Sequence, residues 1–519
     1  MEAPGKDAAA GTTELRPWIT RLAWTLVGLG VLARVVRFLA NRSLWRDECA
    51  LALNVIERPF SGLFQPLDHA QVAPLGFLAL SKASVSVFGS GEYALRLVPL
   101  AAGLASLPLF YLTLREFLGR GEALVALMLL SISEPLIFYS SEVKQYASDV
   151  LVCTSILLPG ARILCRGMTW SRLLAFAGTG IIGVWFSIPA AYVCAAVGAS
   201  LLLQSLRGKR WIEALGVGLA SAACLASFLA HYRPFLAPAQ ADNYLAESWD
   251  AFTVPPPRFS AEVLDWYRRS SFAVFNDPLG FPSTEIAAAV FLVGAVLVFR
   301  RRALVSSMLL APIALALIAG MLGLMPFPVS DEHHLLDRYY PFYGRLLLFT
   351  APSFFAAMGG GLAFLLQSSD ARRNFLGPIV ALLLLTLPVF QCLCNTLSPP
   401  EIQETRPLIE AVASRFQAGD RIYSQTFAAL PLRYYARRTG LPDAAGELRL
   451  RNTRKDQEKL RRQIQGLPAG SRFWLVTLHH PHWESEAELA DIRVVLKPTT
   501  ERIDQLRFEN CEASLYRTR

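Results

Sequence analysis

Long apolar runs alternate with short polar loops over the first three quarters of the chain. A helix needs about 20 apolar residues to cross the hydrocarbon core of a bilayer. The pattern predicts an all-α polytopic membrane protein with about eleven transmembrane helices. Their expected ranges are 22–40, 94–114, 121–139, 145–164, 172–186, 188–206, 212–231, 284–299, 303–324, 345–366 and 375–394.

The pattern changes after the last of these runs. Helical spacing of apolar residues in RPLIEAVASRF and RKDQEKLRRQIQ is interleaved with strand-like stretches in DRIYSQ, RFWLVTLHH and ASLYRT. Helices that alternate with strands are typical of an α/β layer. We therefore expect a small α/β domain over residues 395–519.

Two of the polar loops are long, at 41–92 and 233–282. The first contains the semi-apolar stretch LFQPLDHAQVAPLGFLALSK, which is typical of amphipathic helices that lie along a membrane surface. Residues 1–21 lack a clear small-residue cleavage site, so they read as the start of an uncleaved anchor. The expected domains are this N-terminal segment, a transmembrane domain over 22–394, and the tail.

The chain is 53% hydrophobic and only 18% charged, with a formal net charge of +9. No basic stripe interleaved with aromatic residues is present, so the charge does not indicate nucleic-acid binding. Cytoplasmic loops of membrane proteins collect Lys and Arg, which accounts for the charge. Such clusters occur at Arg115 and Arg120; Arg162, Arg166 and Arg172; Arg207, Lys209 and Arg210; Arg300, Arg301 and Arg302; and Arg372 and Arg373.

These clusters predict that both long loops and the tail lie on the outer face of the membrane. The N-terminal segment is then cytoplasmic. Arg34, Arg37, Arg42 and Arg46 depart from the rule, because they lie at the outer end of the first run. We interpret them as candidates for holding a lipid phosphate there.

Acidic residues gather where the predicted helices meet the outer face. They are Asp47, Glu48, Asp68, Glu142, Asp149, Asp331, Glu332 and Asp337. A proton-coupled transporter would carry such residues near the middle of its helices. Their position at the rim favours chemistry at the membrane surface.

Asp47 and Glu48 follow the first apolar run directly, in SLWRDECAL. One interpretation is a helix cap, with the aspartate as N-cap and the glutamate in the first turn. The other is a catalytic pair, in which Asp47 is a general base that takes a proton from a hydroxyl group. Cys49 lies beside them and could pair with Cys511 in an oxidising compartment, which the sequence does not decide.

The segment 138–150, FYSSEVKQYASDV, is a second candidate. We expect it to open the fourth transmembrane helix, with Glu142, Tyr146 and Asp149 on one face. A helix start with an interfacial tyrosine is the plainer alternative. Lys144 argues against that alternative, because a lysine at a helix start opposes the helix dipole.

Arg345 marks a third candidate, at the outer edge of the tenth predicted helix. Its guanidinium matches phosphate oxygens in geometry, although an arginine there could also simply extend its head group to the interface. Arg96, Arg34 and Arg37 are weaker candidates of the same kind. A divalent metal ion held by Asp47, His69 and either His333 or His334 is conceivable, against ordinary exposed loop histidines.

Several motifs in this order resemble those of the GT-C glycosyltransferases that use polyprenyl-phosphate sugars. That superfamily includes protein O-mannosyltransferase, the aminoarabinose transferase of lipid A and the rhizobial lipid A galacturonosyltransferase group. The motifs that carry the resemblance are SLWRDECALAL, QVAPLGFLALSK, FGSGEYALRLVPLAAGLASLPLFYLTLREFLG, FYSSEVKQYASDVL, GRLLLFTAP and GDRIYSQTFAALPLRYY. It covers residues 20–350 most clearly.

One departure concerns the first loop. The aminoarabinose transferase has Glu and Lys before the Pro-Leu of its motif, where they help to hold metal and lipid phosphate. Here the matching stretch is Gln71-Val72-Ala73-Pro74. We expect Lys82, His69 and Arg345 to substitute for the missing pair.

The resemblance implies transfer of a sugar from a polyprenyl-phosphate donor to a lipid, polysaccharide or protein acceptor of the cell envelope, with inversion. The enzyme would lie in the bacterial cytoplasmic membrane, with its site on the outer face. The roles implied are catalytic for Asp47, Glu48 and Glu142; donor or phosphate binding for Lys144, Tyr146, Arg345, Lys82 and Arg96; acceptor or loop positioning for Gln71 and Asp68; and metal binding for His69 and His333.

Three other classes of protein remain open. A lipid-linked glycan flippase or transporter would need charged residues deep in its helices. A polysaccharide polymerase or ligase would also be a membrane enzyme with a large outer loop. In a structural or sensory protein, the Asp-Glu and Glu-x-Lys motifs would be incidental.

Overall fold

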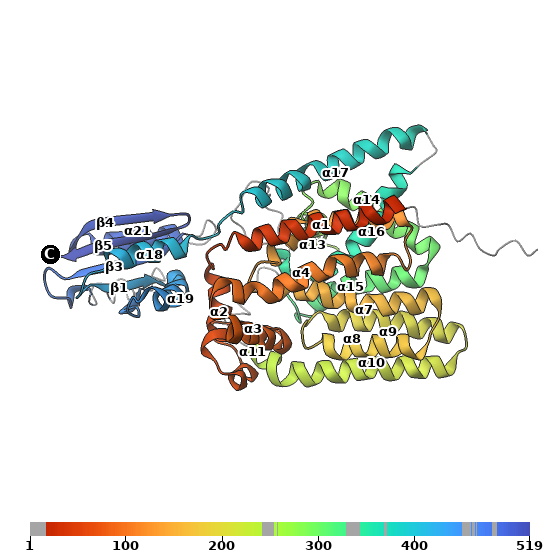
Figure 1. Cartoon of the computed structure of the whole chain (residues 1–519), viewed down its shortest axis with the longest axis horizontal. Helices are drawn as coiled ribbons and strands as arrows, with labels where there is room; N and C mark the ends of the chain where they lie inside the picture. Colours follow the sequence, from red (N-terminus) through yellow and green to blue (C-terminus); the bar gives the residue numbers. More distant parts are fainter. Residues whose placement is uncertain are drawn as a thin grey trace, which may run out of the picture.

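A long helical part and a small sheet domain at one of its ends make up the molecule (Figure 1). The computed structural model describes residues 17–240, 254–327 except 257, 343–367, 371–448, 458, 462, 464–479 and 485–519. The N-terminal end of α1 (Pro17–Leu39) lies at the opposite end of the molecule from the sheet.

The helical part is built from helices whose bounds follow the apolar runs closely. After α1 they are α2 (Arg46–Glu57), η1 (Phe60–Phe64), α3 (Leu75–Phe88), α4 (Glu92–Leu114), α5 (Arg120–Ile132), α6 (Glu134–Tyr139), α7 (Tyr146–Arg166), α8 (Trp170–Gly183), α9 (Ala190–Arg207), α10 (Trp211–His231), η2 (Tyr232–Leu236), α11 (Ala237–Gln240), α13 (Ala261–Asn276), α14 (Thr284–Arg301), α15 (Ala303–Met321), η5 (Tyr343–Thr350), α16 (Ala351–Leu366) and α17 (Ala371–Leu397).

Eight helices within the described ranges are long and apolar enough to cross a membrane, by length and composition. They correspond to eight of the eleven predicted transmembrane helices, so the chain is a mostly helical, polytopic membrane protein. The other three predicted transmembrane helices are helical as well, but they are too short or too charged to count as membrane spans. The run 121–139 is broken between α5 and α6, α8 has only 14 residues, and α14 carries charges at both ends.

Close helix contacts inside this part rest on small residues. Where α14 crosses α16, a Cβ atom on Gly294 would lie 1.7 Å from the carbonyl oxygen of Ala357. A Cβ on Gly361 would lie 2.0 Å from the carbonyl oxygen of Val290. Membrane helices approach closely through such residues, since lipid supplies no hydrophobic drive between helices.

The first long loop forms helices, as expected, but α2 does not lie on the surface. Its residues from Glu48 to Val55 are buried, and it packs between α3 and the helix α19 (Ala429–Thr439) of the tail. The tail domain covers the side of α2 that the loop alone would expose, whereas the predicted amphipathic stretch, residues 63–82, overlaps η1 and α3.

The tail forms the predicted small α/β domain. Its sheet has the order β2-β1-β3-β5-β4, parallel from β2 to β3 and antiparallel beyond. The strands are β1 (Arg421–Gln425), β2 (Gly446–Leu448), β3 (Arg472–Leu478), β4 (Thr500–Phe508) and β5 (Cys511–Thr518), and the helices are α18 (Thr405–Arg415), η6 (Thr426–Ala428), α19 and α21 (Ser485–Leu496). The sequence pattern did not reveal β2, β4 or α21, and the predicted helix RKDQEKLRRQIQ lies largely outside the described residues.

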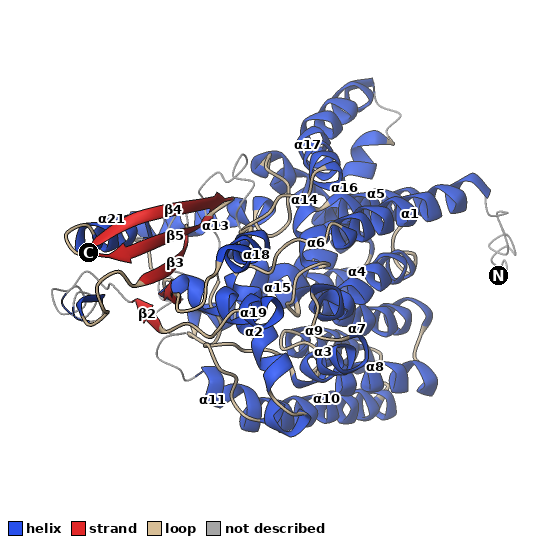
Figure 2. Cartoon of the chain, turned by 60° about the vertical axis from the view of Figure 1, so that its left-hand side comes forward, coloured by secondary structure: helices blue, strands red, loops and turns tan. Residues whose placement is uncertain are grey.

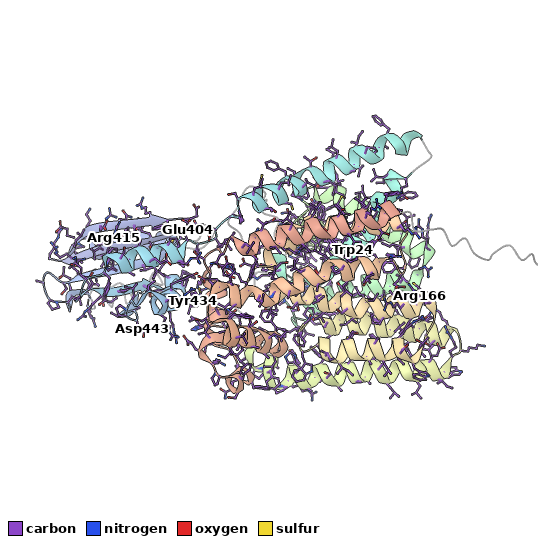
Figure 3. All side chains as sticks on the ribbon, in the orientation of Figure 1. Trp24, Arg166, Glu404, Arg415, Tyr434 and Asp443 are labelled. Carbon is purple, nitrogen blue, oxygen red and sulfur yellow. The ribbon has the colours of Figure 1, made fainter. Side chains whose placement is uncertain are left out.

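Helix α19 lies between the sheet and the helical part (Figure 2). Tyr434 and Glu404 lie at this junction, whereas Arg166 lies at the far end of the helices (Figure 3). The basic loop that contains Arg166 is thus at the opposite end of the molecule from the tail domain.

Candidate active site

The N-terminal turn of α2 lies at the junction of the helical part and the tail domain. The helix begins at Arg46, after Trp45 as N-cap, so Asp47 and Glu48 are in its first turn. The Trp45 amide donates to Oε2 of Glu48 at 3.4 Å, so the cap interpretation applies to Glu48. Asp47 is not the N-cap, and its side chain has other partners.

Asp47 forms a small polar cluster with Lys144 and Gln71. Nζ of Lys144 lies 2.9 Å from Oδ1 of Asp47. Nε2 of Gln71 donates to the same oxygen at 3.3 Å, and Oε1 of Gln71 accepts from Lys144 at 2.7 Å. The side chain of Asp47 is 22% exposed and that of Lys144 is 6% exposed.

The surroundings of Asp47 keep it ionised. Burial raises the pKa of its carboxyl group, but the positive charges of Lys144, Arg345 and Arg46 outweigh burial and leave the pKa below its ordinary value. Burial also lowers the pKa of Lys144, and Asp47 opposes that shift.

Glu48 is held in a closed ion pair. Arg96 of α4 donates to both carboxylate oxygens, at 2.9 and 2.6 Å, and the amide of Val143 donates at 2.8 Å. The side chain is 0% exposed. This geometry does not support a role for Glu48 in proton transfer with a substrate, because its oxygens face only the protein.

Glu142 is also closed off. It pairs with Arg42, and Nε1 of Trp45 donates to its second oxygen at 2.8 Å. Its side chain is 1% exposed. Glu142 was expected to share one helical face with Tyr146 and Asp149. That expectation was wrong for Glu142, because α7 begins only at Tyr146 and Glu142 lies in the turn before it.

Arg345 approaches the same region from η5. Its Nε donates to the hydroxyl of Tyr146 at 3.3 Å, and its charge is among those that lower the pKa of Asp47. The structure therefore brings together residues from four segments: Asp47, Gln71, Lys144 with Tyr146, and Arg345. These are a carboxylate, an amide, a phenol and two cations.

Other candidates lie elsewhere. Nζ of Lys82 donates to the carbonyl of Ile56 at 3.1 Å, and Ile56 is nine residues along α2 from Asp47, roughly 14 Å along its axis. Lys82 therefore caps the far end of α2. Asp68 is 65% exposed and pairs with Arg58.

Two of the arginines that depart from the positive-inside rule, Arg34 and Arg37, have buried side chains. Arg34 donates to the carbonyls of Leu130 and Ser131 near the end of α5, and Arg37 pairs with Glu134 at 2.6 Å. Arg96 donates from all three of its nitrogens to groups of the protein. The described hydrogen bonds of these three arginines run to groups of the protein, and a role for them in holding a lipid phosphate stays a prediction.

The expected metal ligands are only partly described. Among the residues that the structure covers, no three His, Cys, Asp or Glu side chains gather as a metal site. His69 is exposed, and His333 and His334 lie outside the described residues. The described neighbours of Asp47 are an ammonium and an amide nitrogen, which do not fit metal ligation.

An apolar cavity of about 370 Å³ lies between the first loop and α8. Phe64 of η1, Leu75 and Gly76 of α3 and Trp185 line it. His231 fixes this wall, since its Nε2 accepts from the amide of Leu75 at 3.2 Å. Leu75 follows the Gln71–Pro74 stretch, so the cavity begins a few residues from the polar cluster.

Solved structures resemble the whole chain in three dimensions. ArnT from Cupriavidus metallidurans, bound to undecaprenyl phosphate, aligns with a TM-score of 0.56 at 13% identity, over 96% of this chain and 98% of that one. AglB, the archaeal oligosaccharyltransferase from Archaeoglobus fulgidus in complex with an inhibitory peptide and a dolichol-phosphate, gives 0.54 at 10% identity, over 96% and 74%. The chain has the GT-C fold.

The GT-C resemblance seen in the motifs is thereby confirmed for the fold. No protein-family model matches the chain, and no curated protein matches it in sequence. Identities of 10% and 13% show the fold alone, so activity rests on the site itself.

Several residues of this candidate site were missed by the sequence patterns. Trp45 donates to Glu142, and Gln403 and Tyr435 contact the segment before Asp47. Arg42, named above as a phosphate candidate, also pairs with Glu142. Their partners are between 97 and 391 residues away in the chain, beyond the reach of local spacing. Cys49 and Cys511 are both buried and free.

Proposed function

We propose that the chain is a membrane glycosyltransferase that moves a sugar from a polyprenyl-phosphate donor to a cell-envelope acceptor, with Asp47 as general base. One observation carries this proposal. Of the three carboxylates expected to be catalytic, only Asp47 is not fully buried, since its side chain is 22% exposed against 0% for Glu48 and 1% for Glu142. Asp47 also contacts the cation of Lys144 and feels the charge of Arg345, and both cations suit a phosphate.

The reaction is a single displacement. A hydroxyl of the acceptor gives its proton to Asp47 while its oxygen bonds to the anomeric carbon of the sugar. The bond from that carbon to the phosphate oxygen breaks, and its electron pair leaves with the polyprenyl phosphate. A single displacement inverts the anomeric centre; retention would need a second accessible carboxylate.

Lys144 and Arg345 stabilise the departing phosphate. Charge that develops on the leaving group is best stabilised by preoriented cations in a partly dry site. Before the donor binds, Nζ of Lys144 forms an ion pair with Oδ1 of Asp47 at 2.9 Å. Phosphate oxygens would compete for the ammonium, and release of Asp47 from its cation would raise its basicity when the donor is in place. Gln71 and Tyr146 orient these two cations.

The donor tail enters the apolar side of the site. The cavity beside α3 has an almost wholly apolar lining, as an isoprenoid chain requires. ArnT is described bound to undecaprenyl phosphate, and AglB in complex with a dolichol-phosphate and a peptide. These ligands support a polyprenyl-phosphate donor for this chain.

We place the enzyme in the bacterial cytoplasmic membrane, with Asp47 and the tail domain outside. Glu48 and Glu142 are positioning residues in this proposal. A divalent ion at Asp47, His69 and His333 is kept as a separate proposal, and such an ion would have to displace Lys144 from Asp47. Transfer measured before and after treatment with EDTA tests it, and full activity after chelation would contradict it.

The function is tested by mass spectrometry of envelope lipids, glycans and glycoproteins from cells with and without the gene. We expect one sugar to be missing from one acceptor class, and its polyprenyl-phosphate form to accumulate. Unchanged sugars with a lipid-linked glycan trapped on the inner face would favour a flippase. Loss of long glycan chains with intact single sugars would favour a polymerase or ligase.

A further inference from the structure

We infer that the tail domain is part of the catalytic apparatus, because Gln403 and Tyr435 position Asp47 through the main chain that precedes it. The inference rests on the proposed function. It assigns these two side chains as positioning residues, which act through Asp47 without touching the substrate.

The segment 43–46 is held by side chains of the tail. The amide of Leu44 donates to the hydroxyl of Tyr435 at 2.7 Å, and the amide of Arg46 donates to Oε1 of Gln403 at 3.0 Å. Thr405 donates to the carbonyl of Leu44 at 3.1 Å. The amide of Ser43 donates to Glu401 at 3.1 Å.

Arg96 of the helical part also forms hydrogen bonds with this segment. Nη1 of Arg96 donates to the carbonyl of Arg42 at 2.7 Å, and Nη2 donates to the carbonyl of Ser43 at 3.3 Å. Residues 41–45 have no regular secondary structure. Their polar main-chain groups are nevertheless buried, so these partners fix a segment that could not hold its own shape.

Gln403 also acts on α2 itself. The first amides of a helix have no partner within the helix, and Trp45, the N-cap, has no side-chain cap bond. Gln403 supplies an acceptor to Arg46, the residue immediately before Asp47. Gln403 is 3% and Tyr435 is 1% exposed, so water cannot readily replace either.

Ion pairs fix the tail domain itself. Glu92 at the start of α4 pairs with Arg406 and Arg438. At the far end of α2, Glu57 pairs with Arg433 at 2.7 Å and with Arg437 at 2.9 Å. Both ends of α2 are thus tied to the tail, so displacement of the tail would displace Asp47 relative to Lys144.

Tyr434 provides a matched control. It is the neighbour of Tyr435 on α19 and is equally buried, at 3%. Its hydroxyl donates to the carbonyl of Ser90 at 2.9 Å, ahead of α4 and away from Asp47. Tyr434→Phe therefore removes one hydroxyl from the same interface without freeing the segment 43–46.

The test measures transfer by the purified full chain at several pH values. A lipid extract from cells that lack the gene supplies both donor and unmodified acceptor. We expect Tyr435→Phe and Gln403→Met each to lower the maximal rate about tenfold, with the half-saturating extract concentration unchanged, since small misplacements of a catalytic group are costly. Tyr434→Phe should stay within about twofold of the parent.

The pH profile separates positioning from general loss of structure. If Asp47 loosens from Lys144, its pKa rises in the free enzyme, so the acid limb of the rate at low extract concentration moves to higher pH for Tyr435→Phe and Gln403→Met. Equal effects of Tyr434→Phe and Tyr435→Phe, or a fall in rate with an unmoved acid limb, would overturn the inference. Undiminished transfer by Asp47→Asn would instead overturn the proposed base, so the two failures are distinguishable.

Discussion

At the scale of single residues, neighbouring acidic residues of the site differ in their burial and in their charged partners. Asp47 and Glu48 are adjacent in the chain, yet Asp47 is half-buried beside Lys144, whereas Glu48 is fully buried and paired with Arg96. Successive residues of a helix point about 100° apart, which explains why one faces the site and the other the interior. An acid-rich motif therefore need not be a catalytic pair.

The ion pair with Lys144 sets the pH dependence of the reaction. Asp47 acts only when ionised, so activity is present above its pKa and is lost as pH falls through it. Lys144 lowers that pKa against the effect of burial. In Lys144→Met the lowering is lost while burial remains, so the acid limb of the rate at low donor concentration, which reports the free enzyme, should move to higher pH.

Lys144→Arg is the control for this prediction, because it keeps a cation beside Asp47. Rates of the two variants across pH 3–8 provide the measurement. An acid limb that stays in place for Lys144→Met would show that Lys144 does not control the ionisation of Asp47.

At the scale of elements, α2 is fixed by a buried ion pair near its start. Removal of one partner of such a pair leaves an uncompensated charge, at a cost of about 3–5 kcal/mol. We therefore expect Glu48→Gln to lower the stability of the protein by that order, because Arg96 loses its carboxylate. Thermal unfolding of the purified protein in detergent would measure it.

Glu57→Gln is the matched comparison on the same helix. Its arginine partners are nearly half exposed, and exposed ion pairs contribute at most about 1 kcal/mol. A Glu57→Gln variant as destabilised as Glu48→Gln would show that the buried pair has no special role.

The sequence predicted elements far better than contacts. Apolar runs located the long helices, and α/β alternation located the tail domain, because burial in lipid and in a sheet each leave a regular pattern. The partner of Glu48 is 48 residues away and that of Glu142 is 100 residues away. Such pairings depend on how helices pack, which local spacing does not encode, so the pairing of Arg96 with Glu48 could not be predicted from the sequence.

At the scale of the whole molecule, charge and architecture agree. The basic loop at Arg166 lies at one end of the helices, and the tail domain lies at the other (Figure 3). If the positive-inside rule holds, the tail and Asp47 face outward. The same polarity would place the site where envelope acceptors are found.

Single cysteines test this orientation in intact cells. Asp443→Cys in the tail should react with a membrane-impermeant maleimide, whereas Arg207→Cys should react only after the membrane is permeabilised. Both positions are exposed, and the eight native cysteines are buried or half-buried. The reverse labelling pattern would contradict the proposed sidedness.

The central claim is that Asp47 accepts the proton in sugar transfer. Its most direct test restores the gene to cells that lack it, as the parent, as Asp47→Asn or as Asp68→Asn, and measures the missing sugar by mass spectrometry. General base catalysis contributes about 10²–10⁴-fold, so Asp47→Asn should fail to restore the sugar at normal protein level in the membrane. Asp68→Asn, which changes an exposed acid of the same loop, should restore it. Full restoration by Asp47→Asn would contradict the account.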